Sequence, residues 1–166
     1  MKRNNRGFSL VELIVVVAIL GVCVGLITAS ISTVSSSQAR KCATSIDAAL
    51  SRCRVAAMSR AGTVSLTLSA DGDGVVTVKQ SEKNGETVTE TASDQVGTSR
   101  CAVSYQVKGE TEAKALDAAG ITLSFDRDTG AFVFSGSAIT SITVSGGGRS
   151  YVITLDALTG AHELGG

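Results

Sequence analysis

The sequence has no proline and no tryptophan, and His162 is the one histidine among its 166 residues. A single histidine excludes a metal site built from several imidazoles. It also leaves one candidate general base for a serine or cysteine nucleophile. No nucleophile, base and acid stand together at a recognisable spacing, so we expect no catalytic residues, cofactor or enzymatic activity. Without proline, the turns depend on the 18 glycines and on serine and threonine.

An excess of charge of either sign is also missing. Lys and Arg number 15, as do Asp and Glu, so the net charge is zero with histidine neutral. A protein built throughout to hold nucleic acid normally carries a clear basic excess, so nucleic acid is not an expected partner. Charged residues make up 18% of the chain and hydrophobic residues 43%, which excludes a disordered protein.

One long apolar run lies near the N-terminus, from residue 8 to residue 31, and Glu12 is its single charge. As a helix the run would be about 36 Å long, enough to cross a hydrocarbon core of about 30 Å. The preceding residues 1–7 include three basic side chains, which place that end in the cytoplasm. The run therefore predicts a membrane-spanning helix with the rest of the chain outside the cytoplasm.

A secretory signal peptide cleaved after Ala29 and a plain single-pass anchor are two alternative interpretations of this run. Neither explains Glu12, because a carboxylate at the centre of a membrane helix costs about 2.5–3.5 kcal/mol, although less near the interface. The run is also longer than the apolar region of about 7–15 residues that is typical of a secretory signal.

The apolar run opens with Gly7-Phe8-Ser9-Leu10-Val11-Glu12-Leu13. This motif resembles the processing site of type IV prepilins and type II secretion pseudopilins. In that family a membrane-embedded aspartyl peptidase cleaves between the glycine and the aromatic residue and N-methylates the new terminus. The resemblance implies cleavage after Gly7, methylation of Phe8, and pairing of Glu12 with the N-terminal amine of a neighbouring subunit.

The same resemblance implies a mechanical function, as a subunit of a thin helical filament. Its implied partners are other pilin or pseudopilin subunits, the prepilin peptidase, an inner-membrane assembly platform and, indirectly, the ATPase of that platform. The protein would sit in the cytoplasmic membrane before assembly and in a periplasmic or extracellular filament afterwards. Removal of the leader would leave 12 basic side chains against 15 acidic ones.

A polar but helix-compatible segment follows the apolar run and extends to Ala61. Its apolar residues recur at steps of three and four, which predicts one buried helical stripe. The members of this stripe are Cys42, Ile46, Ala49, Leu50, Cys53 and Ala57. The serine-rich residues 30–37 have poor helix propensity and predict a local weak point in the helix. Gly62 is the expected stop.

From residue 63 the hydrophobic period changes to two, which predicts short strands joined by tight turns and therefore antiparallel pairing. The expected strands are 64–69, 75–80, 87–91, 101–107, 121–125, 131–134, 139–144 and 151–156, with turns at 71–74, 83–85, 128–130 and 146–148. Residues 109–119 are expected as a short helix or a mobile surface loop. The fold class is α+β. The predicted parts are a cleaved leader (1–7), a transmembrane or filament-core helix (8–31), its amphipathic continuation (32–62) and an antiparallel β head (63–166).

Residues 121–160 carry a second resemblance. Their strand order, with Thr129-Gly130-Ala131 and Thr159-Gly160 at the turns, looks like the minor pseudopilin H (FimT-like) group, which implies a minor pseudopilin or minor pilin. That group often ends in a basic segment, whereas residues 159–166 contain no Arg or Lys. A major pilin, a DNA-binding competence minor pilin and a soluble secreted enzyme remain as alternatives.

Three cysteines fall in the expected head and its helix. Cys42 and Cys53 are eleven residues apart on one helix face, about 16.5 Å of rise, which is beyond disulfide reach. Cys101 begins a predicted strand, so we expect a disulfide from Cys101 to Cys53 or to Cys42 outside the cytoplasm. Three buried thiols are the alternative. The spacing does not fit a zinc site.

Three polar features receive ordinary structural interpretations. The acidic residues 71–74 lack the fifth-position oxygen ligand of a calcium loop and predict a hairpin turn. His162, close to the chain end, is expected on the surface. The basic residues of the helix are expected as a solvated face or as salt bridges between subunits; they are Arg40, Lys41, Arg52, Arg54 and Arg60.

Overall fold

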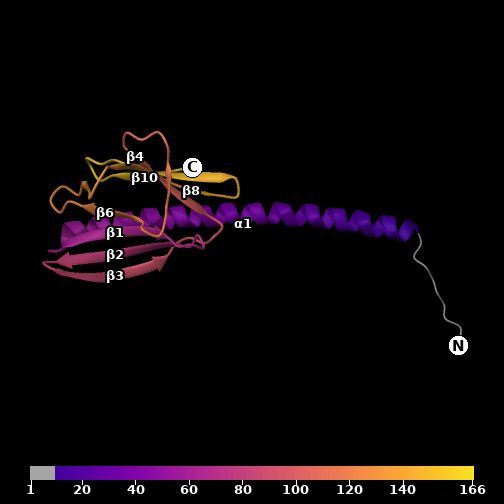
Figure 1. The fold of residues 1–166 in the computed structure, drawn as a ribbon, viewed down its shortest axis with the longest axis horizontal. Helices are drawn as coiled ribbons and strands as arrows, with labels where there is room; N and C mark the ends of the chain where they lie inside the picture. The colour runs from indigo at the N-terminus through magenta and orange to yellow at the C-terminus, as the bar shows by residue number, and fades with distance from the viewer. Residues whose placement is uncertain (1–9) are drawn as a thin grey trace, which may run out of the picture.

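The computed structural model describes residues 10–166, except for the side chains of residues 25–32. In this part the chain forms one long helix, α1 (Leu10–Ser59), followed by a head of antiparallel strands. A helix of 50 residues is about 75 Å long. Figure 1 shows that its N-terminal half projects beyond the head, while its C-terminal half lies against the strands.

The strands form two five-stranded sheets. The first has the order β3-β2-β1-β6-β7 and the second has the order β10-β9-β8-β4-β5. The strands of the first sheet are β1 (Thr63–Ala70), β2 (Val76–Asn84), β3 (Thr87–Gln95), β6 (Ile121–Phe125) and β7 (Phe132–Phe134). Those of the second are β4 (Ala102–Val107), β5 (Lys114–Ala115), β8 (Ile139–Gly146), β9 (Arg149–Leu155) and β10 (His162–Gly165). The chain therefore passes from one sheet to the other after β3, after β5 and after β7.

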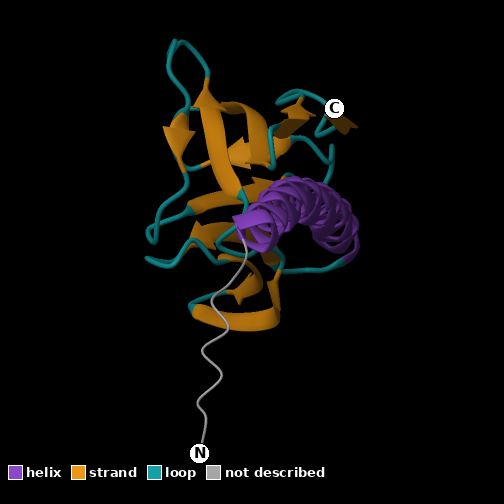
Figure 2. Ribbon diagram, turned by 90° about the vertical axis from the view of Figure 1, so that its right-hand side faces the viewer, coloured by secondary structure: helices purple, strands orange, loops and turns teal. Residues whose placement is uncertain are grey.

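The helix lies between the two sheets and supplies the centre of the core. Figure 2 shows strands on both sides of the helix, which contacts β1, β2 and β6 of one sheet and β8, β9 and β10 of the other. The predicted stripe is confirmed, since all six of its members are at most 3% exposed. Each sheet turns its alternate apolar residues to this stripe, as Leu66 and Leu68 do from β1 and Ile142 and Val144 from β8.

Over the described residues the prediction of the helix is confirmed, and its last residue, Ser59, lies two residues before the expected Ala61. The serine-rich segment is part of the continuous helix, so the expected weak point is not a break. The eight expected strands and the four turns are all present.

Two short strands were not predicted. β5 lies within residues 109–119, where a helix or a loop was expected, and β10 lies at the polar end of the chain. Each is held by pairing to a longer strand, β4 or β9. Neither strand has the apolar residues that mark β7, another short strand, so their alternation does not stand out in the sequence.

Candidate functional site

The projecting half of α1 is an apolar surface without cover. Every large hydrophobic side chain from Leu10 to Val24 is between 49% and 75% exposed. A folded soluble protein rarely exposes so continuous an apolar surface unless it meets a partner or a lipid phase. Over the described residues, no helical segment has the length and apolar character that a membrane crossing requires.

Glu12 is the single charged residue of this surface and lies in the first turn of α1. The first backbone N–H groups of a helix have no intrahelical partner and carry partial positive charge, so a carboxylate is favoured there. The predicted cleavage and methylation residues, Gly7 and Phe8, lie outside the described residues. The structure therefore places Glu12 at the tip of the projecting helix, far from the head.

A family comparison bears on this segment. The family model described as the prokaryotic N-terminal methylation motif matches residues 2–28. The chain carries a prepilin-type methylation motif. The match includes Gly7, Phe8 and Glu12 and ends within α1, so it does not extend to the head. Neither a curated protein nor a solved structure matches the chain. The motif indicates a pilin-like precursor that a prepilin peptidase processes.

In the head of this prepilin-like chain, His162 is not the surface residue that the sequence predicts. Its side chain is only 8% exposed, and its Nε2 lies 2.9 Å from Ser51 Oγ and 3.8 Å from Asp47 Oδ1. Both partners belong to α1, so this contact fixes β10 to the helix. The sequence could not show it, because Ser51 is 111 residues away and β10 itself was not expected.

The geometry of His162 differs from that of a hydrolytic triad. In a triad the serine meets one ring nitrogen and the carboxylate meets the other, which orients the base. Here Ser51 and Asp47 both face Nε2, while the buried Nδ1 has no hydrogen-bond partner among the described residues. The arrangement fits the docking of a terminal strand and not the activation of a nucleophile.

Two turns with the same sequence pattern, Asp-x-x-Thr-Gly-Ala, close the β6–β7 and β9–β10 hairpins. In each, the aspartate carboxylate accepts a 2.7 Å hydrogen bond from the threonine hydroxyl and further bonds from turn N–H groups. These hydrogen bonds lower the pKa of Asp126 and of Asp156, and the bond from the threonine hydroxyl has the largest effect. The turns also touch, because a Cβ on Gly160 would overlap the carbonyl oxygen of Gly130. Residues 126–131 and 156–161 therefore form one compact unit, which we call the twin turns.

The basic side chains of the helix are partly engaged within the subunit. Arg54 Nη2 donates a 2.8 Å hydrogen bond to the Thr159 carbonyl of the twin turns. Arg52 lies 3.6 Å from Asp94 of β3. Three of the five basic residues, counting Arg60, thus contact the head. Four of the five, all but Arg54, are nevertheless exposed, as the prediction of a solvated face requires.

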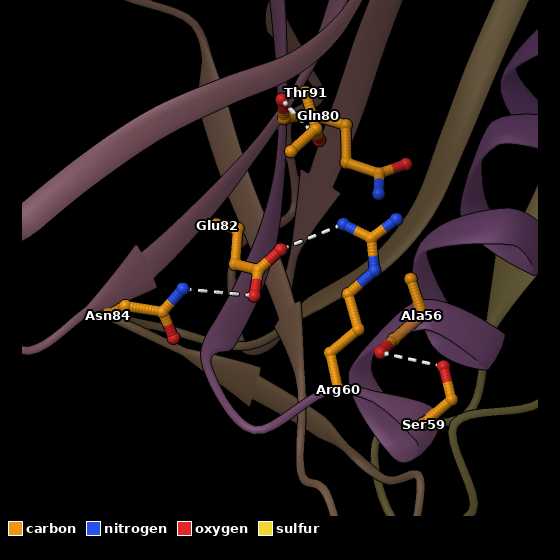
Figure 3. Close-up of polar contacts among 7 residues, drawn as sticks. All are labelled: Ala56, Ser59, Arg60, Gln80, Glu82, Asn84 and Thr91. Atoms are coloured by element: carbon orange, nitrogen blue, oxygen red, sulfur yellow. Dashed lines mark hydrogen bonds and ion pairs between the residues drawn. The ribbon is translucent and has the colours of Figure 1, made fainter.

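Arg60 follows the last turn of α1 and reaches the first sheet. Figure 3 shows its guanidinium beside the Glu82 carboxylate of β2, at 2.8 Å, with Asn84 on the other carboxylate oxygen at 3.1 Å. The Asn84 amide and the Arg60 guanidinium lower the pKa of Glu82. Both groups are partly exposed, so this pair positions the helix end and contributes little to stability.

All four cysteines are free thiols in the structure. Cys42, Cys53 and Cys101 are buried, and Cys23 on the projecting helix is exposed. Cys101 lies beside Cys42, and Cys53 is eleven residues further along α1, about 16.5 Å away. Of the two pairings that the sequence left open, the structure brings together Cys42 and Cys101.

Proposed function

We propose that the protein is a structural subunit, a minor pseudopilin or minor pilin, of a type IV pilus-like or type II secretion filament. The observation that carries the proposal is the projecting apolar half of α1, with Glu12 in its first turn, attached to a folded head. The methylation motif on the same segment supports it.

Assembly would be stabilised by burial of the projecting helices against one another. A fully buried Val, Leu or Ile side chain contributes about 1.5–3 kcal/mol relative to an exposed one, and this helix exposes many of them. Glu12 would neutralise the N-terminal amine of the neighbouring subunit, since each charge alone is costly in an apolar environment. The filament would thus use the apolar helix surface that the head leaves uncovered.

Before assembly, residues 8–31 would anchor the chain in the cytoplasmic membrane with the head outside the cytoplasm. This span includes residues outside the described part of the structure, and the proposal for it rests on the sequence and the motif. A prepilin peptidase would cleave after Gly7 and methylate Phe8. Other pilin-like subunits, the assembly platform and, indirectly, its ATPase would be the partners.

The minor role rests on the resemblance of residues 121–160 to the minor pseudopilin H group. Residues 121–160 contain β6 to β9 and the twin turns. A major pilin would show the same fold elements but should dominate the protein of sheared filaments. Quantitative mass spectrometry of sheared filaments distinguishes the two, since a minor subunit should be scarce there.

A DNA-binding competence pilin is the second alternative. The pairing of Arg52 and Arg60 with carboxylates, and the bond of Arg54 to a carbonyl of the head, argue against it, because a cation that already has an anionic partner gains less from a phosphate. The detergent-solubilised chain should leave duplex DNA unretarded in a gel shift at low salt. Retardation that weakens steeply with added salt would support the competence role instead.

The decisive test of the main proposal is the intact mass and N-terminal peptide of the protein extracted from its native membrane. A chain that begins at N-methylated Phe8 is the expected result. A chain that begins at Ser30 would mean a secreted soluble domain, and the filament role would be wrong.

A further inference from the structure

The thiols of Cys42 and Cys101 meet at Gly97, between the helix and the head. A Cβ on Gly97 would stand 2.9 Å from Cys101 Sγ and 3.0 Å from Cys42 Sγ, so at most about 6 Å separates the two sulfur atoms. Both side chains are buried, with residue exposures of 0% for Cys42 and 5% for Cys101. Only glycine at position 97 leaves room for this approach.

The chain around Cys101 is held firmly against α1. Residues 96–101 form the crossover that leads from β3 of the first sheet to β4 of the second. Within this crossover the Cys101 amide donates to the Thr98 carbonyl at 3.0 Å. The Thr98 hydroxyl in turn donates to the Gln38 side-chain oxygen on α1.

The crossover lies at the point where the helix leaves the head. Among the side chains of α1 that the structure describes, Ala39 is the first that is fully buried, and Cys42 follows it by less than one turn. A bond at this position would therefore tie the root of the projecting helix to the chain that links the two sheets.

We propose that Cys42 and Cys101 are oxidised to a disulfide that fastens α1 to the crossover segment. The oxidant is a disulfide, either low-molecular-weight or carried by a thiol oxidoreductase. One thiolate attacks the oxidant to give a mixed disulfide and release one thiol. The second thiolate then displaces the other half of the oxidant. The chain loses two electrons and two protons, and the oxidant is reduced to two thiols.

The disulfide needs an oxidising compartment, and in that respect it rests on the proposed location of the head outside the cytoplasm. Burial, with the nearby Cys101 thiol as a smaller cause, raises the pKa of Cys42 to about 12. Thiolate is therefore scarce in the packed head, and exchange is slow there. Oxidation belongs to the stage of folding before the crossover closes over the helix.

Cys53 is a matched control on the same face of the same helix. It is fully buried, and burial alone raises its pKa to about 12. Unlike Cys42, Cys53 has no other cysteine of the described residues among the causes of its raised pKa. Cys53 therefore shares the burial and the helical position of Cys42 but lacks the partner.

Peptide mapping under non-reducing conditions tests the proposal on the full chain. The protein is extracted from its membrane in the presence of an alkylating agent, so that free thiols are marked. Trypsin cuts after Lys41, Arg52, Arg54 and Arg100, which places Cys42, Cys53 and Cys101 on separate peptides. We expect peptide 42–52 linked to peptide 101–108, with Cys53 alkylated. Alkylated Cys42 and Cys101, or a link to the Cys53 peptide, would overturn the proposal.

Refolding of the purified chain with oxidised and reduced glutathione separates the two reasons for failure. A pair that stays reduced in both experiments shows that the geometry does not support the bond. A pair that links on refolding but is free in cells shows that the head does not reach an oxidising compartment. The second result would overturn the disulfide in the cell and the proposed filament location together.

A stability measurement checks the role of the bond. Dithiothreitol should lower the melting temperature of the wild type and of Cys53→Ser by about 5 °C or more, because the bond closes a long loop. Cys42→Ser and Cys101→Ser should not respond to the reductant. An equal response in all four proteins would contradict the proposal.

Discussion

Glu12 is one carboxylate on an otherwise apolar surface. No other residue of α1 from Leu10 to Val24 is charged, so Glu12 has no counterion on this part of the helix. In a filament core an unpaired carboxylate would be costly, whereas a pair with a neighbouring amine is tolerated. A substitution of Glu12 therefore tests assembly without changing the fold of the head.

Replacement of Glu12 by glutamine should leave processing intact and block assembly. Breaking a buried ion pair costs about 3–5 kcal/mol, so the variant should enter filaments at least about tenfold less than the wild type. Immunoblots of sheared filaments and of membranes measure the two pools. Val11→Leu, an apolar exchange one residue away, is the control and should assemble normally. Wild-type levels of the glutamine variant in filaments would contradict the role of Glu12.

Only the folded structure shows why position 160 requires glycine. Its φ is +68°, a left-handed conformation that glycine adopts without strain, and a Cβ there would overlap the Gly130 carbonyl. Gly160→Ala should therefore destabilise the protein by about 2–4 kcal/mol. Gly136→Ala is the control, since a Cβ on Gly136 has nothing within 4 Å, and it should change stability by less than about 0.5 kcal/mol. Urea unfolding followed by circular dichroism measures both.

The twin turns are the element that joins the two sheets at their far end. One turn belongs to the first sheet and the other to the second. Arg54 of α1 donates to the Thr159 carbonyl of one turn and lies against Gly130 of the other. Each turn depends on an ionised aspartate that accepts hydrogen bonds from its own threonine. The element should therefore respond to pH.

Protonation of Asp126 should lower the free energy of unfolding of the head at acidic pH. Its pKa is lowered in the folded state, so its contribution is complete above the ordinary aspartate pKa and is lost as the pH falls through the lowered value. Asp126→Asn should be less stable than the wild type at pH 7, and the difference should shrink towards pH 3. Asp128→Asn removes a carboxylate that accepts none of these turn hydrogen bonds and should show no such trend. A pH-independent difference for Asp126→Asn would mean that its charge is not the cause.

At the scale of the whole molecule, one core connects the helix and both sheets. The buried stripe of α1 and the apolar faces of the two sheets belong to a single cluster of packed side chains. The head should therefore unfold in one transition, and the loss of a central side chain should weaken all of it.

Leu50→Ala tests this continuity. Leu50 is fully buried at the centre of the cluster, so its truncation should cost about 2–5 kcal/mol and lower a single unfolding midpoint. Leu158→Ala makes the same chemical change at a side chain that is 87% exposed and should be nearly neutral. Two separate transitions in Leu50→Ala would show that the sheets are independent units.

Much of the fold was predictable because its signals are local. The change from a period of 3.6 to a period of two fixes where α1 gives way to strands, and the glycine and aspartate turns fix the hairpins. Glu12 stood out because a single charge in an apolar run is costly, and the motif around it needs only seven residues of sequence.

Other features depend on residues that meet only in the folded chain. The division of the strands into two sheets, the pairing of β10, the contact of His162 with Ser51 and the choice of Cys42 over Cys53 all join distant segments. Local propensity carries no information about such contacts. Packing around α1 decides where the chain crosses from one sheet to the other. The sequence by itself therefore determined the helix, eight of the strands and the methylation motif. The tertiary structure decided which side chains those elements bring together.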